Sequence, residues 1–321
     1  MKPLLLVLDD WEGRIQKADC WDRVMDLVEI KFLKESIEKT NGFEIEQAQF
    51  LMALRERTVL DEKLFNRMPK LKLILQTGGH AYHIDTRAAQ QRNIVIALGR
   101  KVKAPLISVP ELTFAFMLGL IHKVHQGTYA MQNGEWKLFT GRTLSGRRLG
   151  ILGLGRHGSR VAHVASTAFN MEVVAWNRSE NKYEERYAVK RLPLDELLAT
   201  SDVVSIHLRL SPESVGLINK ERLAKMKPDA LLINTSRGAI VDENALIEAL
   251  TKRTIEGAGL DVFAEEPLPN QSPLRRLDNV ILTPHIGWTV AEVFEEFAHI
   301  ACTQLIDYLH DNLANSELLV E

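Results

Sequence analysis

Short apolar runs alternate with amphipathic or charged stretches along most of the chain. Three runs near the start predict strands, at residues 4–8, 71–76 and 94–98, and the charged stretches at residues 19–27 and 47–57 predict the connections of βαβ units. A second series of apolar runs predicts further strands, at residues 149–152, 171–176, 203–207, 231–234, 257–262 and 280–282. Continuously apolar strands that alternate with helices are typical of a sheet covered on both faces. The pattern therefore predicts an α/β protein with a doubly wound parallel sheet.

The alternation breaks between Gly99 and Pro110, where the composition suits a crossing between domains. We place the first domain boundary there. Residues 111–132 then predict one long helix that is apolar on more than one face. Such a helix is either buried within its own subunit or covered at a subunit interface, and the sequence leaves both open. A last helical pattern, at residues 291–313, is expected to return to the first domain.

The most informative stretch is Gly153-Leu154-Gly155-Arg156-His157-Gly158, which follows an apolar run and precedes a helical pattern at residues 159–169. Strand, glycine turn, helix and second strand follow in the order that a dinucleotide site needs. Gly153 permits the tight turn, Gly155 lets a pyrophosphate approach the backbone, and Gly158 lets helix and strand pack closely. Amides at the helix N-terminus would face the phosphates. The alternative is a glycine-rich connection without a ligand.

Composition narrows the class of protein. The chain has 321 residues, of which 45% are hydrophobic, enough for two domains with a core each. Its 40 basic and 42 acidic residues are interspersed and leave a formal net charge of -2. This balance offers no basic field for nucleic acid and no polybasic patch for a membrane, so we expect neither partner.

The sequence also gives little indication of an export signal, a membrane span or a metal site. The first apolar run meets Asp9-Asp10, which predicts a strand rather than an export signal, and the apolar residues 114–121 fall short of the roughly 20 needed to span a membrane. Cys20 and Cys302 lie far apart in the sequence and have no metal spacing, so we expect reduced thiols without a chemical role in a cytoplasmic protein. No helix-spaced histidine pair or cysteine cluster predicts a metal site.

Polar residues follow three of the predicted strands of the second series. Arg237 comes after residues 231–234, Asp261 and Glu266 come at and after residues 257–262, and His285 comes after residues 280–282. Because ligands bind beyond the carboxyl ends of strands in an open parallel sheet, these side chains are expected at the edge that carries the glycine turn.

That set suits hydride transfer to a 2-oxo acid. Arg237 offers a permanently charged fork for a carboxylate, and His285 is suited to donate a proton because its reference pKa lies near neutrality. A neighbouring carboxylate would favour the protonated histidine, and Glu266 is preferred over Glu265 partly because Pro267 fixes the adjacent backbone and partly because of the family resemblance described below. The alternatives without a catalytic role are that Arg237 is a surface arginine, that Glu266 is a solvated loop charge, and that His285 is a half-buried histidine with its hydrogen bonds satisfied.

Cofactor choice depends on the end of the second strand of the glycine unit. An acidic residue there would bind the ribose hydroxyls of NAD, but this chain has Asn177-Arg178-Ser179. Arg178 and Ser179 can bind a 2′-phosphate, so NADP(H) is favoured over NAD(H); the alternative is that Arg178 points to solvent or stacks on adenine. His207 is assigned a cofactor-edge or structural role. The complete set assigned to the cofactor is Gly153, Gly155, Arg156, His157, Gly158, Asn177, Arg178, Ser179, His207, Thr235, Ser236 and Asp261.

The sequence resembles the D-isomer-specific 2-hydroxyacid dehydrogenase family. The matching segments are residues 149–155, 207–213, 231–243 (LLINTSRGAIVDE), 260–269 (LDVFAEEPLP) and 279–287 (NVILTPHIG). The resemblance implies a Rossmann cofactor domain, residues 101–286, inserted in a flavodoxin-like substrate domain of residues 1–100 and 287–321. It implies a homodimer joined through the cofactor domains. It also implies that Arg237 anchors the substrate, Glu266 partners the histidine and His285 is the acid/base.

The first domain departs from the family pattern. Where members hold the substrate carboxylate on a loop reading Ala-Val-Gly, this chain has Gly78 and Gly79 to supply amides and His80 in the usual glycine position. Pro110 replaces an alanine and stiffens the entry to the long helix. Trp288 stands where a small residue is more common and would narrow the substrate pocket.

Three functions follow from these features. The leading one is an oxidoreductase that interconverts a small D-2-hydroxy acid and its 2-oxo acid, such as glycolate with glyoxylate or glycerate with hydroxypyruvate. A D-3-phosphoglycerate dehydrogenase is the enzyme alternative; no appended regulatory domain is expected, and its extra cations would come from Arg87, Arg100, Lys101 or Lys103. A nucleotide-sensing, corepressor-like protein without turnover is the alternative of another class. The presence of Arg237, Glu266 and His285 together argues against such a sensor, because a protein without turnover needs no proton donor opposite the nicotinamide.

Overall fold

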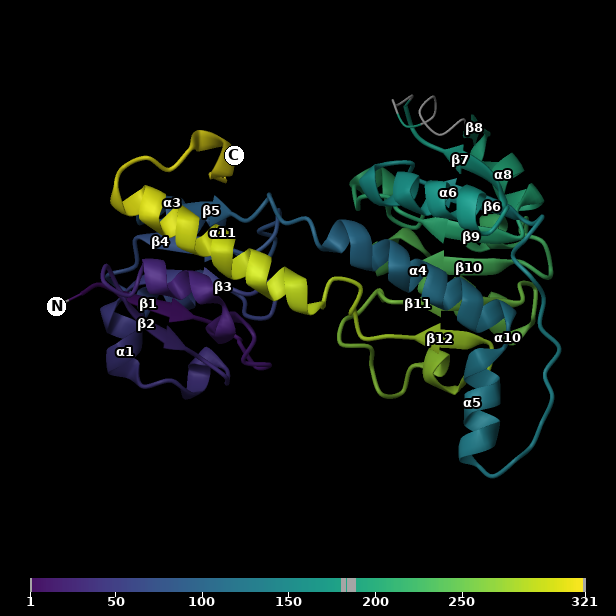
Figure 1. Cartoon of the computed structure of the whole chain (residues 1–321), viewed down its shortest axis with the longest axis horizontal. Coiled ribbons are helices and arrows are strands. Elements are labelled where there is room, and N and C mark those ends of the chain that lie inside the picture. Colours follow the sequence, from purple (N-terminus) through teal and green to yellow (C-terminus); the bar gives the residue numbers. More distant parts are fainter. Residues whose placement is uncertain (1, 180–182, 184–188, 320–321) are drawn as a thin grey trace. The chain divides into compact units, whose positions relative to one another are not determined.

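The computed structural model describes residues 2–179, 183 and 189–319. The chain forms two compact units, one made of Met1–Ala104 and Thr289–Glu321 and the other of Pro105–Trp288. Each unit has its own sheet of parallel strands and its own apolar core (Figure 1). The predicted α/β class with parallel sheets is thereby confirmed. The family resemblance implies that the chain crosses between domains after residues 100 and 286, while the structure divides the chain into its two compact units after Ala104 and Trp288.

The first unit contains a five-stranded sheet in the order β2-β1-β3-β4-β5. This is the strand order of flavodoxin-like folds. The strands are β1 (Leu4–Val7), β2 (Glu29–Phe32), β3 (Ala48–Ala53), β4 (Leu73–Gln76) and β5 (Val95–Leu98), and the helices are α1 (Gly42–Gln47), α2 (Glu62–Asn66), α3 (Thr86–Gln91) and α11 (Ala291–Leu309). The C-terminal α11, yellow in Figure 1, packs beside β4 and on two short 3-10 helices, η1 (Ile15–Lys17) and η2 (Asp19–Arg23).

The central strand of this sheet corrects a prediction. Residues 47–57 were expected to form a connection, yet they contain β3, which pairs with both β1 and β4. Phe50, Leu51 and Met52 are buried. A strand buried on both faces has no alternating pattern, and the polar residues on either side made this one resemble an amphipathic segment. The edge strand β2 was also missed, because its burial is only partial.

The second unit contains a seven-stranded sheet in the order β12-β11-β10-β9-β6-β7-β8. The order reverses between β6 and β9, which is the switch point of a Rossmann fold, where ligands bind beyond the strand ends. The strands are β6 (Arg148–Leu152), β7 (Glu172–Trp176), β8 (Lys190–Arg191), β9 (Val203–Ile206), β10 (Leu231–Asn234), β11 (Gly257–Leu260) and β12 (Val280–Leu282). All except the two-residue β8 were expected from apolar runs, with bounds that differ by a few residues.

The helices of the second unit cover this sheet. They are α4 (Pro105–Ile121), α5 (Val124–Gln132), α6 (Arg156–Ala168), α8 (Leu194–Thr200), α9 (Lys220–Leu223) and α10 (Glu243–Thr251). The single helix expected over residues 111–132 is wrong: α4 starts six residues earlier, at Pro105, and the chain bends by 67° before α5. Lys123 at the bend has a left-handed φ of 58°, which ends a right-handed helix. Pro110 lies inside α4 rather than at its entry.

The apolar character of α4 is explained within its own unit. Phe114, Phe116 and Met117 are buried, and the helix packs on α6, β10, β11 and β12 (Figure 1). Gly259 of β11 permits this close approach, since a Cβ there would lie 2.6 Å from the Phe116 side chain. Among the described residues, no single helix has the length and apolar composition to cross a membrane; the bent pair α4 and α5 meets both criteria only when taken together.

Candidate active site

The glycine turn lies between β6 and α6, and each of its glycines is constrained differently. Gly153 has a φ of 97°, in the region that favours glycine, and a Cβ there would lie 2.7 Å from the carbonyl oxygen of His207. A Cβ on Gly158 would lie 2.2 Å from the carbonyl oxygen of Gly153. A Cβ on Gly155 would meet nothing within 4 Å, so the backbone there is open to a ligand. The turn thus presents the N-terminus of a 13-residue helix to an anion.

The helix begins at Arg156, three residues before the expected start. The exposed Arg156 and the partly buried His157 form its first turn. The imidazole of His157 is hydrogen-bonded to the backbone carbonyl of Pro105, and burial lowers its pKa. His157 therefore joins the first turns of α6 and α4.

His207 lies directly after β9. Its Nε2 is 2.9 Å from the Ser205 hydroxyl. Burial, with a further contribution from nearby His157, lowers the pKa of His207 to about 3. The imidazole is therefore neutral near pH 7. The backbone carbonyl of His207 packs against Gly153. These contacts describe a structural support of the turn, one of the two roles expected for His207.

The end of β7 carries Asn177, Arg178 and Ser179. Asn177 accepts a hydrogen bond from the backbone N–H of Leu154 at 2.7 Å, which ties this strand end to the glycine turn. Arg178 and Ser179 are exposed. Arg178 pairs at 3.6 Å with the carboxylate of Glu213 in the short helix η4 (Pro212–Ser214), a residue for which the sequence predicted no role. A hydrogen bond from Ser211 lowers the pKa of Glu213, which keeps this carboxylate charged beside Arg178.

The end of β10 positions Thr235, Ser236 and Arg237. The Thr235 hydroxyl lies 3.1 Å from that of Thr113 in α4, and the Ser236 hydroxyl donates to the carbonyl of Leu208. The guanidinium of Arg237 is half-buried and donates to the Ser236 carbonyl at 2.7 Å. These bonds fix the chain as it leaves the strand, and they place a cation at the carboxyl edge of the sheet.

His285 and Glu266 meet beyond the ends of β11 and β12. The Nδ1 of His285 is 2.7 Å from Oε2 of Glu266, and the other carboxylate oxygen accepts the backbone N–H of Phe263 at 3.0 Å. Burial acts to raise the pKa of Glu266, but the hydrogen bonds from His285 and Phe263 and the charges of His285 and Arg237 outweigh it and lower that pKa. An ionised carboxylate therefore holds Nδ1, which leaves Nε2 as the ring atom available for proton exchange.

Asp261 holds the loop that carries His285. One of its carboxylate oxygens accepts the Thr283 hydroxyl at 2.5 Å and the Ile286 N–H at 2.8 Å, and the other accepts the Gly287 N–H at 2.9 Å. His285 has a left-handed φ of 56°, an uncommon conformation for a residue other than glycine, and these bonds maintain it. Burial raises the pKa of Asp261. Sequence reasoning assigned Asp261 to the cofactor; its role in positioning the histidine loop needed the structure.

The proposed substrate loop lies in the first unit. Gly78 has a φ of 88°, and a Cβ there would lie 2.2 Å from a terminal nitrogen of Arg55, so the guanidinium lies directly against the loop. Gly79 lies beside the stem of Arg100, and the ring of His80 stacks on Tyr82 with centroids 5.3 Å apart. The sequence did not identify Arg55 as a candidate substrate ligand. Its charged segment was expected to be a helical connection, whereas it is the loop that follows strand β3.

The four candidate cations of the sequence analysis are placed as follows. Arg100 donates to the carbonyl of Ser316, Lys101 pairs with Glu317, Lys103 donates through its backbone to Glu296, and Arg87 is exposed in α3. Arg55 is therefore the cation nearest to Gly78. Trp288 is the last residue of the second unit and is partly buried.

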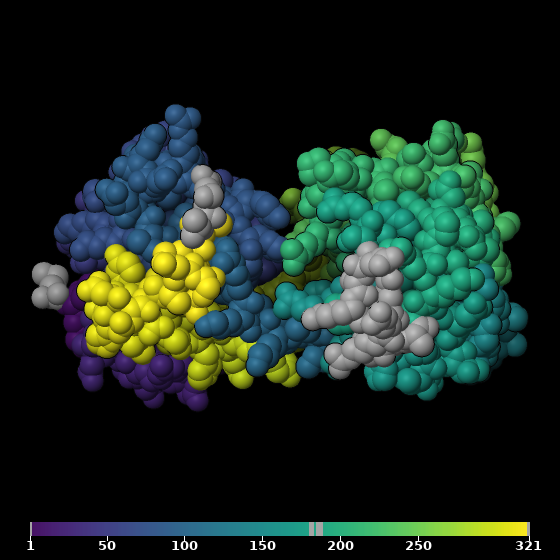
Figure 2. Space-filling view, turned by 90° about the horizontal axis from the view of Figure 1, so that it is seen from above, coloured from purple at the N-terminus to yellow at the C-terminus, as the bar shows by residue number. Residues whose placement is uncertain are grey.

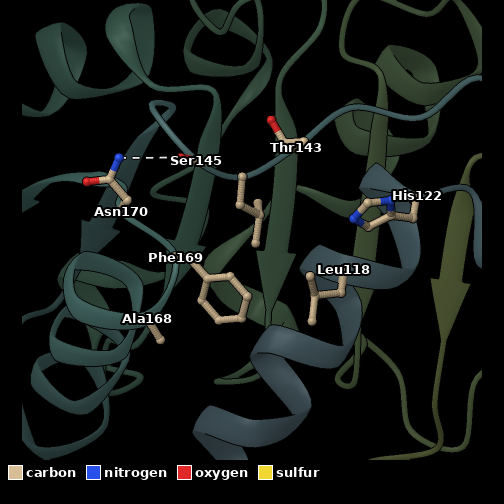
Figure 3. Close-up of a pocket in the computed structure, with 8 residues that line it drawn as sticks. Leu118, His122, Thr143, Ser145, Ala168, Phe169 and Asn170 are labelled. Carbon is tan, nitrogen blue, oxygen red and sulfur yellow. Dashed lines mark hydrogen bonds between the residues drawn. The ribbon is translucent and has the colours of Figure 1, made fainter.

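A cavity of about 280 Å³ lies elsewhere in the second unit (Figure 3). Its lining comes from the ends of α4 and α6 and from the segment before β6: Leu118, His122, Thr143, Leu144, Ser145, Ala168, Phe169 and Asn170. Asn170 donates to the Ser145 hydroxyl at 3.3 Å. These residues precede β6 and β7, whereas the candidate site follows the strands, so the cavity is not part of that site. The described residues contain no group of three or more His, Cys, Asp or Glu placed to hold a metal ion.

Comparison with known proteins shows the family to which this chain is similar. The model described as "D-isomer specific 2-hydroxyacid dehydrogenase, NAD binding domain" matches residues 114–287. The glyoxylate reductase of Thermococcus litoralis is 35% identical over 307 residues, covering 91% of this chain and 92% of that protein. The D-3-phosphoglycerate dehydrogenase of Methanocaldococcus jannaschii is 35% identical over 83% of this chain and 51% of its own length. A solved D-lactate dehydrogenase from Aquifex aeolicus, complexed with NAD and lactic acid, is 27% identical with a TM-score of 0.81 over 99% of each chain.

Proposed function

Because this chain belongs to the D-isomer specific 2-hydroxyacid dehydrogenase family, we propose that it is an oxidoreductase acting on the CH-OH group of a small D-2-hydroxy acid, or on the matching 2-oxo acid in reverse. The observation that carries this proposal is the 2.7 Å contact between His285 and Glu266 on the sheet edge that also carries Arg237. The proposed pairs are glyoxylate with glycolate and hydroxypyruvate with glycerate.

The proposed chemistry divides among three side chains. A bound nicotinamide cofactor supplies the hydride. Arg237 binds the substrate carboxylate and polarises the 2-oxo group, since its planar fork matches a carboxylate. His285 donates the Nε2 proton to the oxygen that becomes the hydroxyl. Glu266 holds Nδ1 and orients the ring. Gly78, Gly79 and His80 are proposed to bind the substrate, with Trp288 limiting its size.

A nicotinamide dinucleotide fits the residues at the glycine turn. The open backbone at Gly155 and the helix N-terminus suit its pyrophosphate, and Asn177, Thr235, Ser236 and Asp261 are proposed to bind the remainder. We propose NADP(H) over NAD(H), because the end of β7 carries the exposed Arg178 and Ser179 rather than an acidic residue. Glu213 already pairs with Arg178, so a 2′-phosphate would share or replace that ion pair.

Arg178→Ala tests the cofactor choice. The KM for NADPH is expected to rise about tenfold or more, which is the loss of one charge-assisted contact, while the KM for NADH changes little. Steady-state kinetics with both cofactors measure this difference. Equal effects on the two cofactors would remove the case for a phosphate site.

A turnover assay tests the activity itself. Reduced cofactor is mixed with the protein and a panel of 2-oxo acids, and the loss of reduced-nicotinamide absorbance is followed. Oxidation with glyoxylate or hydroxypyruvate is the expected result. Cofactor binding without turnover across the panel would favour a corepressor-like sensor of nucleotides.

The second candidate activity is that of a D-3-phosphoglycerate dehydrogenase. It is favoured by the similarity to that relative and by the guanidinium of Arg55 against Gly78, which could meet a phosphate. A higher kcat/KM for 3-phosphohydroxypyruvate than for hydroxypyruvate, reversed by Arg55→Gln, would select it. The opposite preference selects the leading proposal.

We also propose a homodimer that forms through the second unit, in the cytoplasm, with neither nucleic acid nor membrane as partner. Four large apolar side chains are exposed over residues 129–138, from the end of α5 into the segment that follows it: Tyr129, Met131, Trp136 at 85% and Leu138 at 88% exposure. Exposed apolar groups gathered on one segment are typical of protein interfaces. Sedimentation is expected to give a dimer that Trp136→Ser with Leu138→Ser converts to a monomer. An unchanged dimer would move the interface elsewhere.

A further inference from the structure

The two cysteines of the chain meet inside the first unit. Cys20 lies in η2 and Cys302 in α11, and their sulfur atoms are 3.0 Å apart although 282 residues separate them in the sequence. Their exposed fractions are 1% and 0%. Figure 2 shows purple N-terminal atoms directly beside the yellow C-terminal segment that contains α11. The expectation of reduced thiols agrees with the structure, in which both cysteines are free and buried; their contact with each other was not predicted from their distant positions in the sequence.

We propose that Cys20 and Cys302 are an oxidant-sensitive thiol pair, which a hydroperoxide converts to a reversible disulfide within the chain. Both thiols belong to the same unit, so the bond requires no movement of one unit against the other. The proposal is independent of the dehydrogenase activity, because neither cysteine follows a strand of the second unit.

The chemistry needs one equivalent of hydroperoxide. The Cys20 thiolate attacks the terminal peroxide oxygen, the O–O bond breaks, and the products are a Cys20 sulfenic acid and an alcohol, or water when the oxidant is hydrogen peroxide. The sulfur of Cys302 then attacks that of Cys20, and the S–O bond breaks. Hydroxide leaves and takes up the thiol proton to give water. Two thiols thus lose two electrons and two protons, and the peroxide accepts both.

The contact itself distinguishes the two sulfur atoms. Cys302 donates its S–H to the sulfur of Cys20, and this hydrogen bond lowers the pKa of Cys20. The same contact, together with burial, raises the pKa of Cys302. Since the thiolate is the nucleophile, Cys20 makes the first attack and Cys302 resolves it.

Access to Cys20 depends on the short helix that carries it. The ring of His299 in α11 contacts the carboxylate of Asp19 in η2 at 2.9 Å, so this pair joins the same two elements on the solvent side of the thiols. Asp19 is 88% exposed and His299 50% exposed. Local opening of η2 would admit a small peroxide, since short segments held by few contacts open more readily than the core. We therefore expect opening, rather than the distance between the thiols, to limit the rate.

The disulfide would join the N-terminal and C-terminal parts of the first unit. It would close a loop that includes the whole second unit, which restricts the unfolded chain and stabilises the folded one. It would also hold α11, whose Glu296 accepts the backbone N–H groups of Lys103 and Ala104 at the chain crossing.

The test uses the full-length reduced protein and hydrogen peroxide. Thiols are counted after denaturation, and tryptic peptides are mapped without reduction. The expected result is loss of both thiols together, a Cys20–Cys302 crosslinked peptide and recovery of both thiols with dithiothreitol. Two thiols that persist, oxidation of each cysteine alone, or crosslinks only between chains would overturn the proposal.

Variants sharpen the test. Cys20→Ser and Cys302→Ser each leave one thiol and are expected to give no crosslink within the chain; Cys302→Ala serves where the serine variant does not fold. His299→Ala is expected to speed thiol loss in the protein with both cysteines, whereas an unchanged or slower rate contradicts opening of η2 as the limiting step. The oxidised wild type is expected to melt at a higher temperature than the reduced form. Equal melting temperatures would contradict a stabilising link.

Discussion

Two histidines at strand ends of the second unit have opposite environments. His285, after β12, is 29% exposed and contacts the carboxylate of Glu266. The ring of His207, after β9, lies 2.9 Å from the hydroxyl of Ser205, and burial lowers its pKa to about 3. The first can carry a proton to a ligand, and the second is kept neutral. A strand-end position alone therefore does not identify a candidate acid/base; the charged partner and the open ring nitrogen of His285 distinguish it from His207.

A second difference concerns what each histidine supports. The loop of His285 is held by three hydrogen bonds to Asp261. These bonds fix the left-handed backbone conformation of His285 and thereby position its side chain. At His207 the backbone carbonyl packs against Gly153, and the ring Nε2 lies 2.9 Å from the Ser205 hydroxyl. The contacts around His285 position its side chain, whereas those around His207 support the glycine turn.

The largest expected effect separates the two histidines by activity. His285→Gln removes the proposed proton donor and is expected to lower kcat about a hundredfold to ten-thousandfold. The matched His207→Gln retains a polar side chain beside Ser205 and is expected to keep most of its kcat. Steady-state rates at saturating cofactor measure both. Similar losses in the two variants would remove the distinction drawn here.

A second, smaller effect separates them by stability in acid. Unfolded His207 takes up a proton below about pH 6.5, whereas folded His207 stays neutral down to a pKa of about 3. The unfolded state therefore binds more protons in this window, and the free energy of unfolding falls as pH falls, by at most about 1.4 kcal/mol per pH unit from this group. His207→Gln is expected to flatten that slope.

Urea unfolding between about pH 6 and pH 4 measures the slope. A slope that is unchanged in His207→Gln would contradict the buried, neutral assignment.

The carboxyl edge of the second unit was predictable because its signals are local. Strands β9 to β12 are short apolar runs, and the polar residues that matter follow them directly, so parallel topology alone brings Arg237, Glu266 and His285 to one edge. The choice of Glu266 over Glu265 agrees with the contact that His285 makes. The flavodoxin-like strand order of the first unit came only through resemblance to a family, since two of its strands were not recognised.

The features that were missed depend on contacts between distant segments. β3 is buried on both faces and is followed closely by Arg55-Glu56-Arg57, which gives the segment the composition of a helical connection. The contact of Arg55 with Gly78 exists only once β3 and β4 are paired. The break after α4 depends on the left-handed backbone of Lys123, and a lysine carries no signal for it. The cysteine pair needs α11 to return to the first unit.

The proposed pairing of His285 with Glu266 is tested by a comparison of two adjacent glutamates. Glu266→Gln keeps the shape of the side chain but removes the charge at His285 Nδ1, whereas Glu265→Gln makes the same change one residue away. We predict that kcat for reduction of the preferred 2-oxo acid falls on the order of ten- to a hundredfold in Glu266→Gln, the loss of one charge-assisted hydrogen bond, and stays near wild type in Glu265→Gln. Equal rates for the two variants, or a larger loss in Glu265→Gln, would contradict the assignment of His285 and Glu266 as the acid/base pair.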